Sequence, residues 1–294
     1  MNFHQHNFTA MASPCQFLLQ GEAALMQQAC IKAQAEVQRI EKKYSRYLDS
    51  SLLQTINKNA GIKSTTIDAE TAGLLNYADL CYQQSDGNFD ITSGILRRVW
   101  NFKSNSLPDE KTIQQLLPLI NWYSVQWDQN TIFLPEKNME IDFGGFGKEY
   151  AADRAAEIFQ SLGIQHGLVD LGGDIRIIGD KTDKSGWDIG IRNPSQPESA
   201  ISHITLHQGA MATSGNYERF MQVKHQHYCH ILKANTGWPV NHWASVTILA
   251  PQCLVAGSLA TLTMLAEQKG EKWIREQEIP FLAIDLKGLQ LSNF

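Results

Sequence analysis

The amino-acid sequence predicts an α+β fold in which mixed or antiparallel sheets pack against helices. Helical and strand patterns both occur along the 294 residues, but they do not alternate in the strict βαβ order of a parallel sheet. Hydrophobic residues make up 43% of the chain, which is enough for a large core. No repeat or clear linker divides the sequence, so we expect residues 1–294 to form a single domain or two intimately packed lobes.

The first part of the chain carries clear helical patterns. A strand is expected over residues 15–19, followed by a helix from about Glu22 to Lys43. A second helix is expected after Asp68, whose side chain is suited to an N-cap, and a third near residues 109–117. The residues expected on buried helical faces are Ala33, Val37, Ile40, Tyr44, Leu74, Ala78 and Cys81.

Strands predominate in the rest of the chain. A strand is expected to end at Ile141-Asp142, and a glycine-rich turn then leads into a helix over 148–162 that stops at Gly163. Further strands are expected at 168–171, 175–178, 187–191, near Ile204, at 246–248 and at 281–284. A last helix, over 254–267, is expected to bury Val255, Leu259, Leu262 and Ala266.

Composition excludes several classes of function. Charged residues make up 19% of the chain, the net charge is −5 and no basic block occurs, so nucleic acid is not an expected partner. The longest apolar stretches have strand length, so no membrane span is expected. The N-terminal residues 1–7 lack the pattern of a secretory signal, and the five cysteines are widely spaced. We therefore expect a cytoplasmic protein with reduced, buried thiols.

Five glycine-rich or polar segments stand out, at residues 86–92, 141–148, 170–174, 212–215 and 230–239. Each one alone is typical of an ordinary turn, and Gly172-Gly173 is typical of a bulge. The turn over 144–147 differs, because it precedes a helix and is followed by Lys148. Its backbone amides, the helix N-terminus and an ammonium are together suited to a phosphate. Since the spacing matches neither a Rossmann fingerprint nor a Walker loop, it indicates a diphosphate ligand in a different scaffold.

Three histidines lie close together in the sequence, at His225, His227 and His230. On a strand, the first two would share a face and His230 would lie opposite, which is poor geometry for one metal ion. We therefore expect His230 to have its own role and the other two to be solvated or packed. For His230, a proton-transfer or phosphate-contact role and a strand-end hydrogen bond to a carbonyl both stay open.

These segments resemble the motifs of the ApbE-like FAD:protein FMN transferases. Residues 86–92 are similar to D-G-A-F-D-x-T, and 141–153 to I-D-L-G-G-x-A-K-G-Y-A-x-D. Residues 170–176 resemble N-x-G-G-D-I-R, 212–215 resemble A-T-S-G, and 230–239 resemble H-I-I-D-P-x-T-G-x-P. Residues 256–261 resemble A-D-A-L-A-T, and 45–57 resemble S-x-Y-x-x-x-S-x-L-x-x-x-N. The matches run in family order over nearly the whole chain.

The resemblance implies an ApbE-like fold with FAD in a cleft between lobes. It implies FAD contacts from Met11, Tyr47, Asn88, Phe89, Asp90, Asp142, Lys148 and Ile231. Aromatic rings are suited to packing on flat rings, carboxylates accept hydrogen bonds and an ammonium neutralises phosphate. A Lys148→Ala variant is expected to weaken FAD binding without unfolding the protein.

The resemblance also implies a Mg²⁺ site, with ligands at Gly145, Ala260 and Thr261. Here the chain departs from the family pattern, because Gly257 replaces the aspartate of A-D-A-L-A-T. Either another acid substitutes, FAD phosphates and water hold the ion, or the metal is absent. We expect a weakened site that Gly257→Asp strengthens. Two smaller departures are Glu149 in place of glycine and Lys233-Ala234 in place of Asp-Pro, with Lys233 expected to be exposed.

The activity implied is transfer of FMN from FAD to a threonine or serine hydroxyl of a target protein, with release of AMP. His230, Lys148 and Thr261 are the implied catalytic residues. Two other functions stay open: an FAD pyrophosphatase that forms FMN and AMP, and a non-catalytic FAD-binding protein with a degenerate metal site.

Overall fold

The main element of the fold is an eight-stranded sheet with neighbour order β1-β2-β6-β7-β10-β13-β14-β15. The computed structural model describes residues 3–104, 106–224 and 226–294. Each pair of neighbouring strands in this sheet is antiparallel. The strands are β1 (Phe3–Ala10), β2 (Ser13–Gln20), β6 (Gly167–Leu171), β7 (Asp174–Gly179), β10 (Ala210–Gly215), β13 (Trp243–Ala250), β14 (Phe281–Asp285) and β15 (Gln290–Ser292). The α+β class with antiparallel sheets is confirmed.

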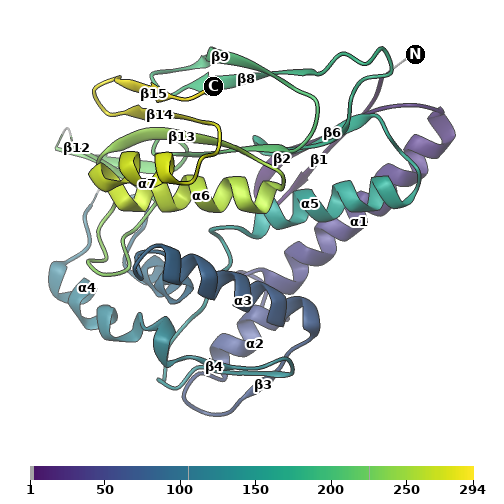
Figure 1. The fold of residues 1–294 in the computed structure, drawn as a ribbon. Helices are drawn as coiled ribbons and strands as arrows, with labels where there is room; N and C mark the ends of the chain where they lie inside the picture. The colour runs from purple at the N-terminus through teal and green to yellow at the C-terminus, as the bar shows by residue number, and fades with distance from the viewer. Residues whose placement is uncertain (1–2, 105, 225) are drawn as a thin grey trace.

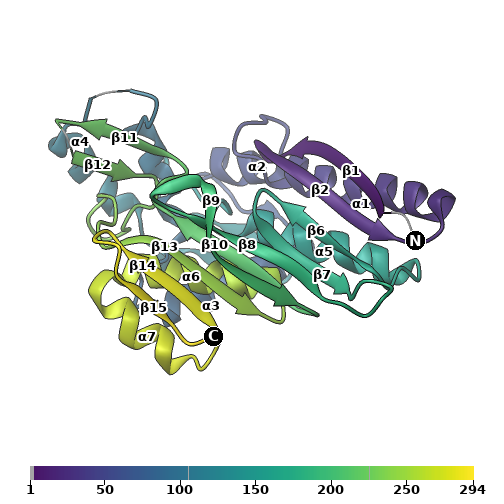
Figure 2. The ribbon, with the colours of Figure 1, turned by 90° about the horizontal axis from the view of Figure 1, so that it is seen from above.

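Helices cover one face of this sheet and a β-hairpin covers the other (Figures 1 and 2). The helices are α1 (Ala23–Tyr44), α5 (Gly147–Ser161), α6 (Cys253–Ala266) and α7 (Gly270–Glu276). The hairpin pairs β8 (Trp187–Asn193) with β9 (Gln196–Leu206). Alternate residues of β8, namely Trp187, Ile189 and Ile191, are buried, as the sequence pattern predicts.

A second lobe lies beyond the helix layer, on the side away from the large sheet (Figure 1). It contains α2 (Leu52–Lys58), α3 (Ala69–Gln84), α4 (Glu110–Leu116) and the small sheet β3 (Thr65–Thr66), β5 (Thr131–Phe133) and β4 (Gln126–Trp127). The 3₁₀ segments are η1 (Ile91–Arg98), η2 (Leu117–Leu119), η3 (Trp122–Ser124) and, after α6, η4 (Glu267–Lys269). The hairpin of β11 (Phe220–Val223) and β12 (Gln226–Cys229) contributes Met221 to a small hydrophobic cluster that also contains Trp100 and, from α4, Ile113.

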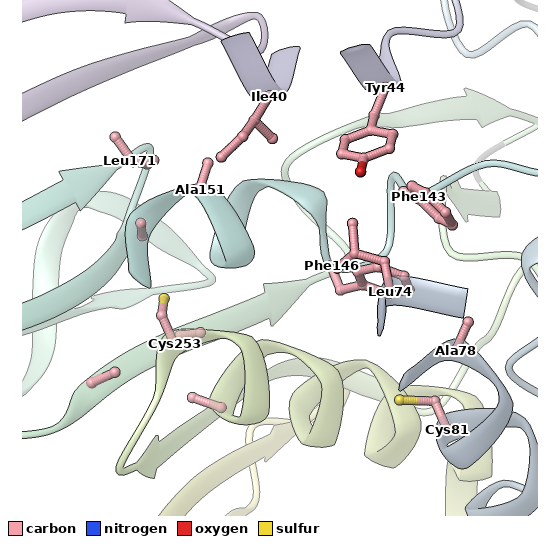
Figure 3. Close-up of a cluster of buried hydrophobic side chains, with 14 of the residues drawn as sticks. Ile40, Tyr44, Leu74, Ala78, Cys81, Phe143, Phe146, Ala151, Leu171 and Cys253 are labelled. Carbon is pink, nitrogen blue, oxygen red and sulfur yellow. The ribbon is translucent and has the colours of Figure 1, made fainter. Parts of the chain in front are cut away.

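One hydrophobic cluster runs through both lobes. Figure 3 shows Phe146, at the start of α5, between Tyr44 of α1 and the α3 residues Leu74 and Ala78. Phe146 is fully buried, and its ring lies 5.3 Å from that of Phe143. The turn before α5 is therefore anchored in the core that joins the lobes.

The expected helices are confirmed. In α1 the face predicted to be buried is buried, and Asp68 caps α3 by accepting a hydrogen bond from Thr71 N at 3.0 Å. All five cysteines are free and buried. Among the described residues, no helix combines the length and apolar character needed to cross a membrane.

The strand expected at Ile141-Asp142 is wrong. The chain there is bound by the Asn57 side chain, which accepts from Ile141 N at 2.8 Å and donates to Ile141 O at 3.1 Å. Asp142 N donates to Ile91 O at 2.9 Å. Because a side-chain amide and a 3₁₀ segment take these bonds, no partner strand is needed.

Two other local expectations also change. Gly172-Gly173 forms the two-residue turn between β6 and β7 and not a bulge, since both residues have positive φ and Leu171 pairs with Asp174. The face predicted for α6 is only partly buried at Val255 and Leu259. The most buried positions include Ala256 and Ala260, because α6 contacts other elements nearly all round.

Candidate active site

The segments at 86–98 and 141–148 lie against each other because glycine permits close contact. A Cβ atom at Gly94 would lie 2.5 Å from the Cβ of Asp142, and one at Gly145 would lie 2.9 Å from the Phe89 ring. Asp142 accepts a hydrogen bond from Gly144 N at 3.0 Å and forms an ion pair with Arg46. The structure therefore brings together expected site residues from two distant segments.

Arg46 lies among the expected site residues, and the sequence analysis did not name it as one of them. Its guanidinium pairs with Asp142 and lies 5.1 Å from the centre of the Tyr47 ring, which is 74% exposed. Arg46 follows Ser45 in the S-x-Y motif, at the position the motif leaves unspecified. The one sequence signal that could have identified Arg46 is its fixed positive charge next to Tyr47, which is expected to contact a ring of FAD.

The glycine turn does not present its amides as freely as expected. Gly144 N donates to Asp142, and both Phe146 N and Gly147 N donate to Phe143 O, at 3.1 and 2.7 Å. These three amides are satisfied within the protein. An anion bound here would therefore depend more on side-chain charge than on the amide cradle inferred from the sequence.

Lys148 is held by the turn between β6 and β7. Its ammonium lies 2.9 Å from Asp174 Oδ2 and donates to Gly172 O at 3.2 Å. Burial lowers the pKa of Lys148, but the charges of Asp174 and Glu149 outweigh burial, so the net shift is upward. The side chain is 24% exposed and half of a buried ion pair, so truncation should cost stability, and the expectation that Lys148→Ala does not unfold the protein stays a prediction.

His230 is surrounded by positive charge. The pKa of His230 is lowered to about 4, mainly by burial and also by the charges of Arg219, Lys148 and Arg46, although the hydrogen bond with Arg219 O raises it. Its Nδ1 lies 3.2 Å from Arg219 O. A carbonyl only accepts, so Nδ1 carries the proton and Nε2 carries the lone pair. The strand-end hydrogen bond is therefore present, and it leaves the second ring nitrogen as a proton acceptor.

Other expected FAD contacts are placed with local structural bonds. Asp90 is buried and caps η1, since its carboxylate accepts from Thr92 N at 2.7 Å, from the Thr92 hydroxyl at 2.6 Å and from Trp122 N at 3.1 Å. Burial raises the pKa of Asp90. Phe89 is 6% exposed and stacks on Phe146. Asp90 and Phe89 thus stabilise the local structure of residues 86–92, and their contact with FAD stays a prediction.

The remaining expected contacts lie at the edges of the same region. Asn88 donates to Ser85 O at 2.8 Å and accepts from Asn235 at 3.4 Å, which links segments 86–92 and 230–239. Met11 lies in the β1–β2 turn with φ of 52°, and Ile231 packs against the core. Two shallow depressions, beside α7 and α4, touch none of the expected FAD contacts, so the cleft for FAD stays a prediction.

Comparison with known proteins assigns the fold to a family. The model of the ApbE family matches residues 11–283. The chain belongs to the ApbE family. It is 30% identical to the FAD:protein FMN transferase of Chlamydia pneumoniae over 251 residues, which cover 82% of this chain and 78% of that protein. It is 28% identical to the protein of that name from Vibrio cholerae over 258 residues, 84% of this chain and 76% of the relative.

Solved ApbE structures share the whole fold. The ApbE protein of Thermotoga maritima has a TM-score of 0.91 and 28% identity, and the match covers 99% of this chain and 97% of that one. The flavinyl transferase ApbE of Pseudomonas stutzeri, at 22% identity and a TM-score of 0.88, shows the fold alone; that match covers 99% of this chain and 95% of that one.

In this ApbE chain the expected metal ligands are oxygen donors without a carboxylate of their own. The Thr261 hydroxyl lies 2.9 Å from that of Ser214, and Ala260 is fully buried in α6. Within the described residues, no group of three His, Cys, Asp or Glu side chains is arranged to hold a metal ion. A Mg²⁺ ion would therefore depend on one or two carboxylates, neutral oxygens and substrate phosphate.

Glu149 is a carboxylate that lies directly beside Gly257. A Cβ atom at Gly257 would lie 2.5 Å from Glu149 Cγ and 2.6 Å from its Oε1. Glu149 is 9% exposed, and its Oε2 has no hydrogen-bond partner. The residues present thus fit a cation. An Asp at 257 would require the flexible Glu149 side chain to move, and the expectation that Gly257→Asp strengthens the site stays a prediction.

Two further expectations near the site are settled by packing. His227 stacks on Phe220 and bonds to Asn216 O at 2.9 Å, as a packed histidine does, whereas His225 lies outside the described residues. Lys233 is not exposed, since it is half-buried and pairs with Glu267 at 2.9 Å. It therefore has a carboxylate partner.

Proposed function

We propose that this chain transfers FMN from FAD to a threonine or serine hydroxyl of a target protein and releases AMP. The observation that carries the proposal is the placement of two cationic side chains among the expected FAD contacts, Arg46 on Asp142 and Lys148 on the turn between β6 and β7. Positive groups in a partly buried site are suited to a diphosphate and to the charge that develops in phosphoryl transfer. The names of the similar proteins support the same activity.

The proposed FAD contacts are Met11, Tyr47, Asn88, Phe89, Asp90, Asp142, Lys148 and Ile231. Arg46 joins them, since it links Asp142 to the exposed Tyr47 ring. Tyr47 offers an aromatic face for a flat ring, and Lys148 and Arg46 offer charge to phosphate. We expect FAD to bind more tightly than FMN or riboflavin in a tryptophan-quenching titration, because only FAD carries the diphosphate; equal affinities would contradict this.

In the proposed reaction the acceptor hydroxyl attacks the phosphorus on the FMN side of FAD. A new P–O bond forms, the bond from that phosphorus to the bridging oxygen breaks, and AMP leaves. His230 is placed to take the hydroxyl proton on Nε2, because Nδ1–H is held by Arg219 O. Lys148 and Arg46 stabilise charge on the phosphate oxygens.

The proposed Mg²⁺ ligands are the backbone oxygens of Gly145 and Ala260 and the hydroxyl of Thr261, with Glu149 beside Gly257. When bound, Mg²⁺ neutralises diphosphate charge and favours departure of AMP. The protein would hold these oxygen ligands in a fixed arrangement, because α6 packs against β10 and β13.

Incubation with FAD, Mg²⁺ and a threonine-containing target peptide tests the proposal. Covalently flavinylated peptide is the expected product. Free FMN and AMP without modified peptide would instead identify a pyrophosphatase, and unchanged bound FAD would identify a binding protein. Either result would overturn the transferase assignment.

We further propose that the protein acts in the cytoplasm on a target reachable from that side. The five free, buried cysteines support a reducing compartment. Fractionation of the native protein should place it with cytoplasmic markers, and recovery from a membrane or exported fraction would contradict the proposal.

A further inference from the structure

Two departures from the family motifs turn out to be in contact. Glu149 and Gly257 lie far apart in the sequence, on α5 and α6. In the structure the Glu149 side chain fills the space where a side chain at 257 would begin, with Cγ and Oε1 at 2.5 and 2.6 Å from the position of that Cβ. The carboxylate that the family motif has at position 257 is therefore replaced, in nearly the same space, by the carboxylate of Glu149.

The Glu149 carboxylate is incompletely satisfied where it lies. It is 9% exposed, and Oε2 lacks a hydrogen-bond partner. Leaving a buried carboxylate oxygen unpaired is costly, so such groups are protonated, paired or bound to a cation. Glu149 Oε2 therefore requires a proton, a hydrogen-bond or ion-pair partner, or a bound cation.

The nearby charges leave room for a cation. Lys148 brings one positive charge, and its ammonium lies on Asp174 at 2.9 Å. Asp174 is itself 3% exposed and acts on Glu149 as a like charge. Lys148 is thus paired with Asp174, and among the described residues no cationic side chain is paired with Glu149.

Neutral oxygen donors lie on the same side of α6. Residue 261 follows residue 257 by one helical turn, so Thr261 lies on the face that Glu149 contacts. Its hydroxyl is 2.9 Å from the Ser214 hydroxyl of β10. A carboxylate with hydroxyl oxygens and water is a donor set that suits a hard divalent cation.

We propose that Glu149 is the carboxylate through which this chain binds a divalent cation, and that Gly257 is required to make room for it. Thr261 supplies a second oxygen. The proposal deepens the proposed phosphoryl-transfer function and rests on it for the role of the cation, but not for its binding. It also predicts that positions 149 and 257 can exchange their residues only together.

The first test measures binding of Mn²⁺ to the full chain by electron paramagnetic resonance, with and without FAD. We expect Glu149→Gln to weaken Mn²⁺ binding by at least about tenfold, since partners that only orient a metal ligand already contribute about 10- to 100-fold. The matched control is Glu157→Gln, on the same helix but 54% exposed, which should bind like wild type. Equal Mn²⁺ affinity of wild type and Glu149→Gln would overturn the proposal, as would a wild type that binds no Mn²⁺ with FAD present.

The second test exchanges the two positions. Gly257→Asp alone should lower the melting temperature, because its Cβ and carboxylate meet Glu149. Glu149→Gly alone should fold and lose Mn²⁺ binding, and the double variant Glu149→Gly with Gly257→Asp should regain both stability and binding. A folded double variant that binds Mn²⁺ no better than Glu149→Gly would overturn the proposal, even if Glu149→Gln did not fold.

Failure of this inference can be told apart from failure of the proposed function. FAD binding in EDTA and transfer of FMN to the target peptide report on the function. If the chain transfers FMN but its Mn²⁺ affinity does not depend on Glu149, only this inference is wrong. If Mn²⁺ binding depends on Glu149 but no FMN is transferred, only the proposed function is wrong.

Discussion

At the scale of single residues, Lys148 shows how an expected ligand contact is also part of the fold. Its ammonium contacts Asp174 and Gly172 O, and its charge contributes to the lowered pKa of His230. The same charge that is proposed to meet phosphate therefore compensates a buried carboxylate.

Lys148→Ala should lower the free energy of unfolding by about 3 to 5 kcal/mol near neutral pH, the usual cost of removing one partner of a buried pair. The physical reason is that Asp174, 3% exposed, would lose its cationic partner and would have to stay buried without it, either charged or protonated. Urea unfolding measures the loss. Lys272→Ala, at an 86% exposed side chain, is the control and should change stability by less than about 0.5 kcal/mol. Similar stabilities of the two variants would contradict the buried pair.

His230 should make stability depend on pH. Its pKa in the folded chain is about 4, against an ordinary value of 6.5, so the unfolded chain binds more protons between those values. The contribution of neutral His230 is complete above pH 6.5 and is lost as pH falls toward 4. Between pH 7.5 and 5, wild type without FAD should lose about 2 kcal/mol more than His230→Gln.

Urea unfolding of both proteins across this pH range gives the difference directly. Glu149 and Asp174, whose pKa values burial raises, and Lys148 remain in both proteins, so their effects cancel to first order. Parallel pH profiles for the two proteins would show that His230 is not in the buried, positively charged environment described.

At the scale of elements, α6 is capped from another helix. Its own N-cap residue, Gln252, makes no side-chain cap, and Asp153 of α5 accepts from Cys253 N and Leu254 N, both at 2.9 Å. Asp153 also pairs with Arg176 of β7 at 3.2 Å. One carboxylate thus fixes α5, α6 and the sheet relative to one another, and with them the distance between Glu149 and Gly257.

Asp153→Ala should cost about 2 kcal/mol of unfolding free energy, at the upper end for loss of an N-cap, because two amides and Arg176 lose a partner. Asp109→Ala is the matched control, since Asp109 is the N-cap residue of α4 but makes no cap hydrogen bond. Thermal and urea unfolding of the two variants should differ clearly. An Asp153 variant as stable as the Asp109 variant would rule out this capping role.

At the scale of the whole molecule, the core does not stop at the junction between the lobes. Phe146 and Tyr44 connect residues of α3 to those of α1 and α5 in one cluster (Figure 3). Because the expected FAD contacts come from both lobes, this shared core is what holds them in one arrangement.

We propose that residues 1–294 unfold as a single cooperative domain. Trp122 in the second lobe and Trp243 in the large sheet are both fully buried, so tryptophan fluorescence reports on both parts. The fluorescence and far-ultraviolet circular dichroism transitions in urea should coincide. Two separated transitions would show instead that the lobes fold independently.

Features that depend on neighbouring residues were determined by the sequence alone. The buried face of α1, the Asp68 cap of α3, the alternation in β8 and the glycine that ends α5 all follow from local periodicity and backbone preference. The order of motifs along the chain also determined the family. The local features can be predicted from a single sequence because the residues that interact are at most a few positions apart.

Features that depend on long-range packing were decided only by the tertiary structure. The bonds of Ile141 to Asn57, the pair of Arg46 with Asp142 and the Asp153 cap of α6 join residues with no local pattern between them. The contact of Glu149 with Gly257 is the same in kind. In the sequence alone, Gly257 and Glu149 are two unconnected departures from the family motifs. Their shared volume exists only once α5 and α6 are packed, since two side chains cannot occupy the same space.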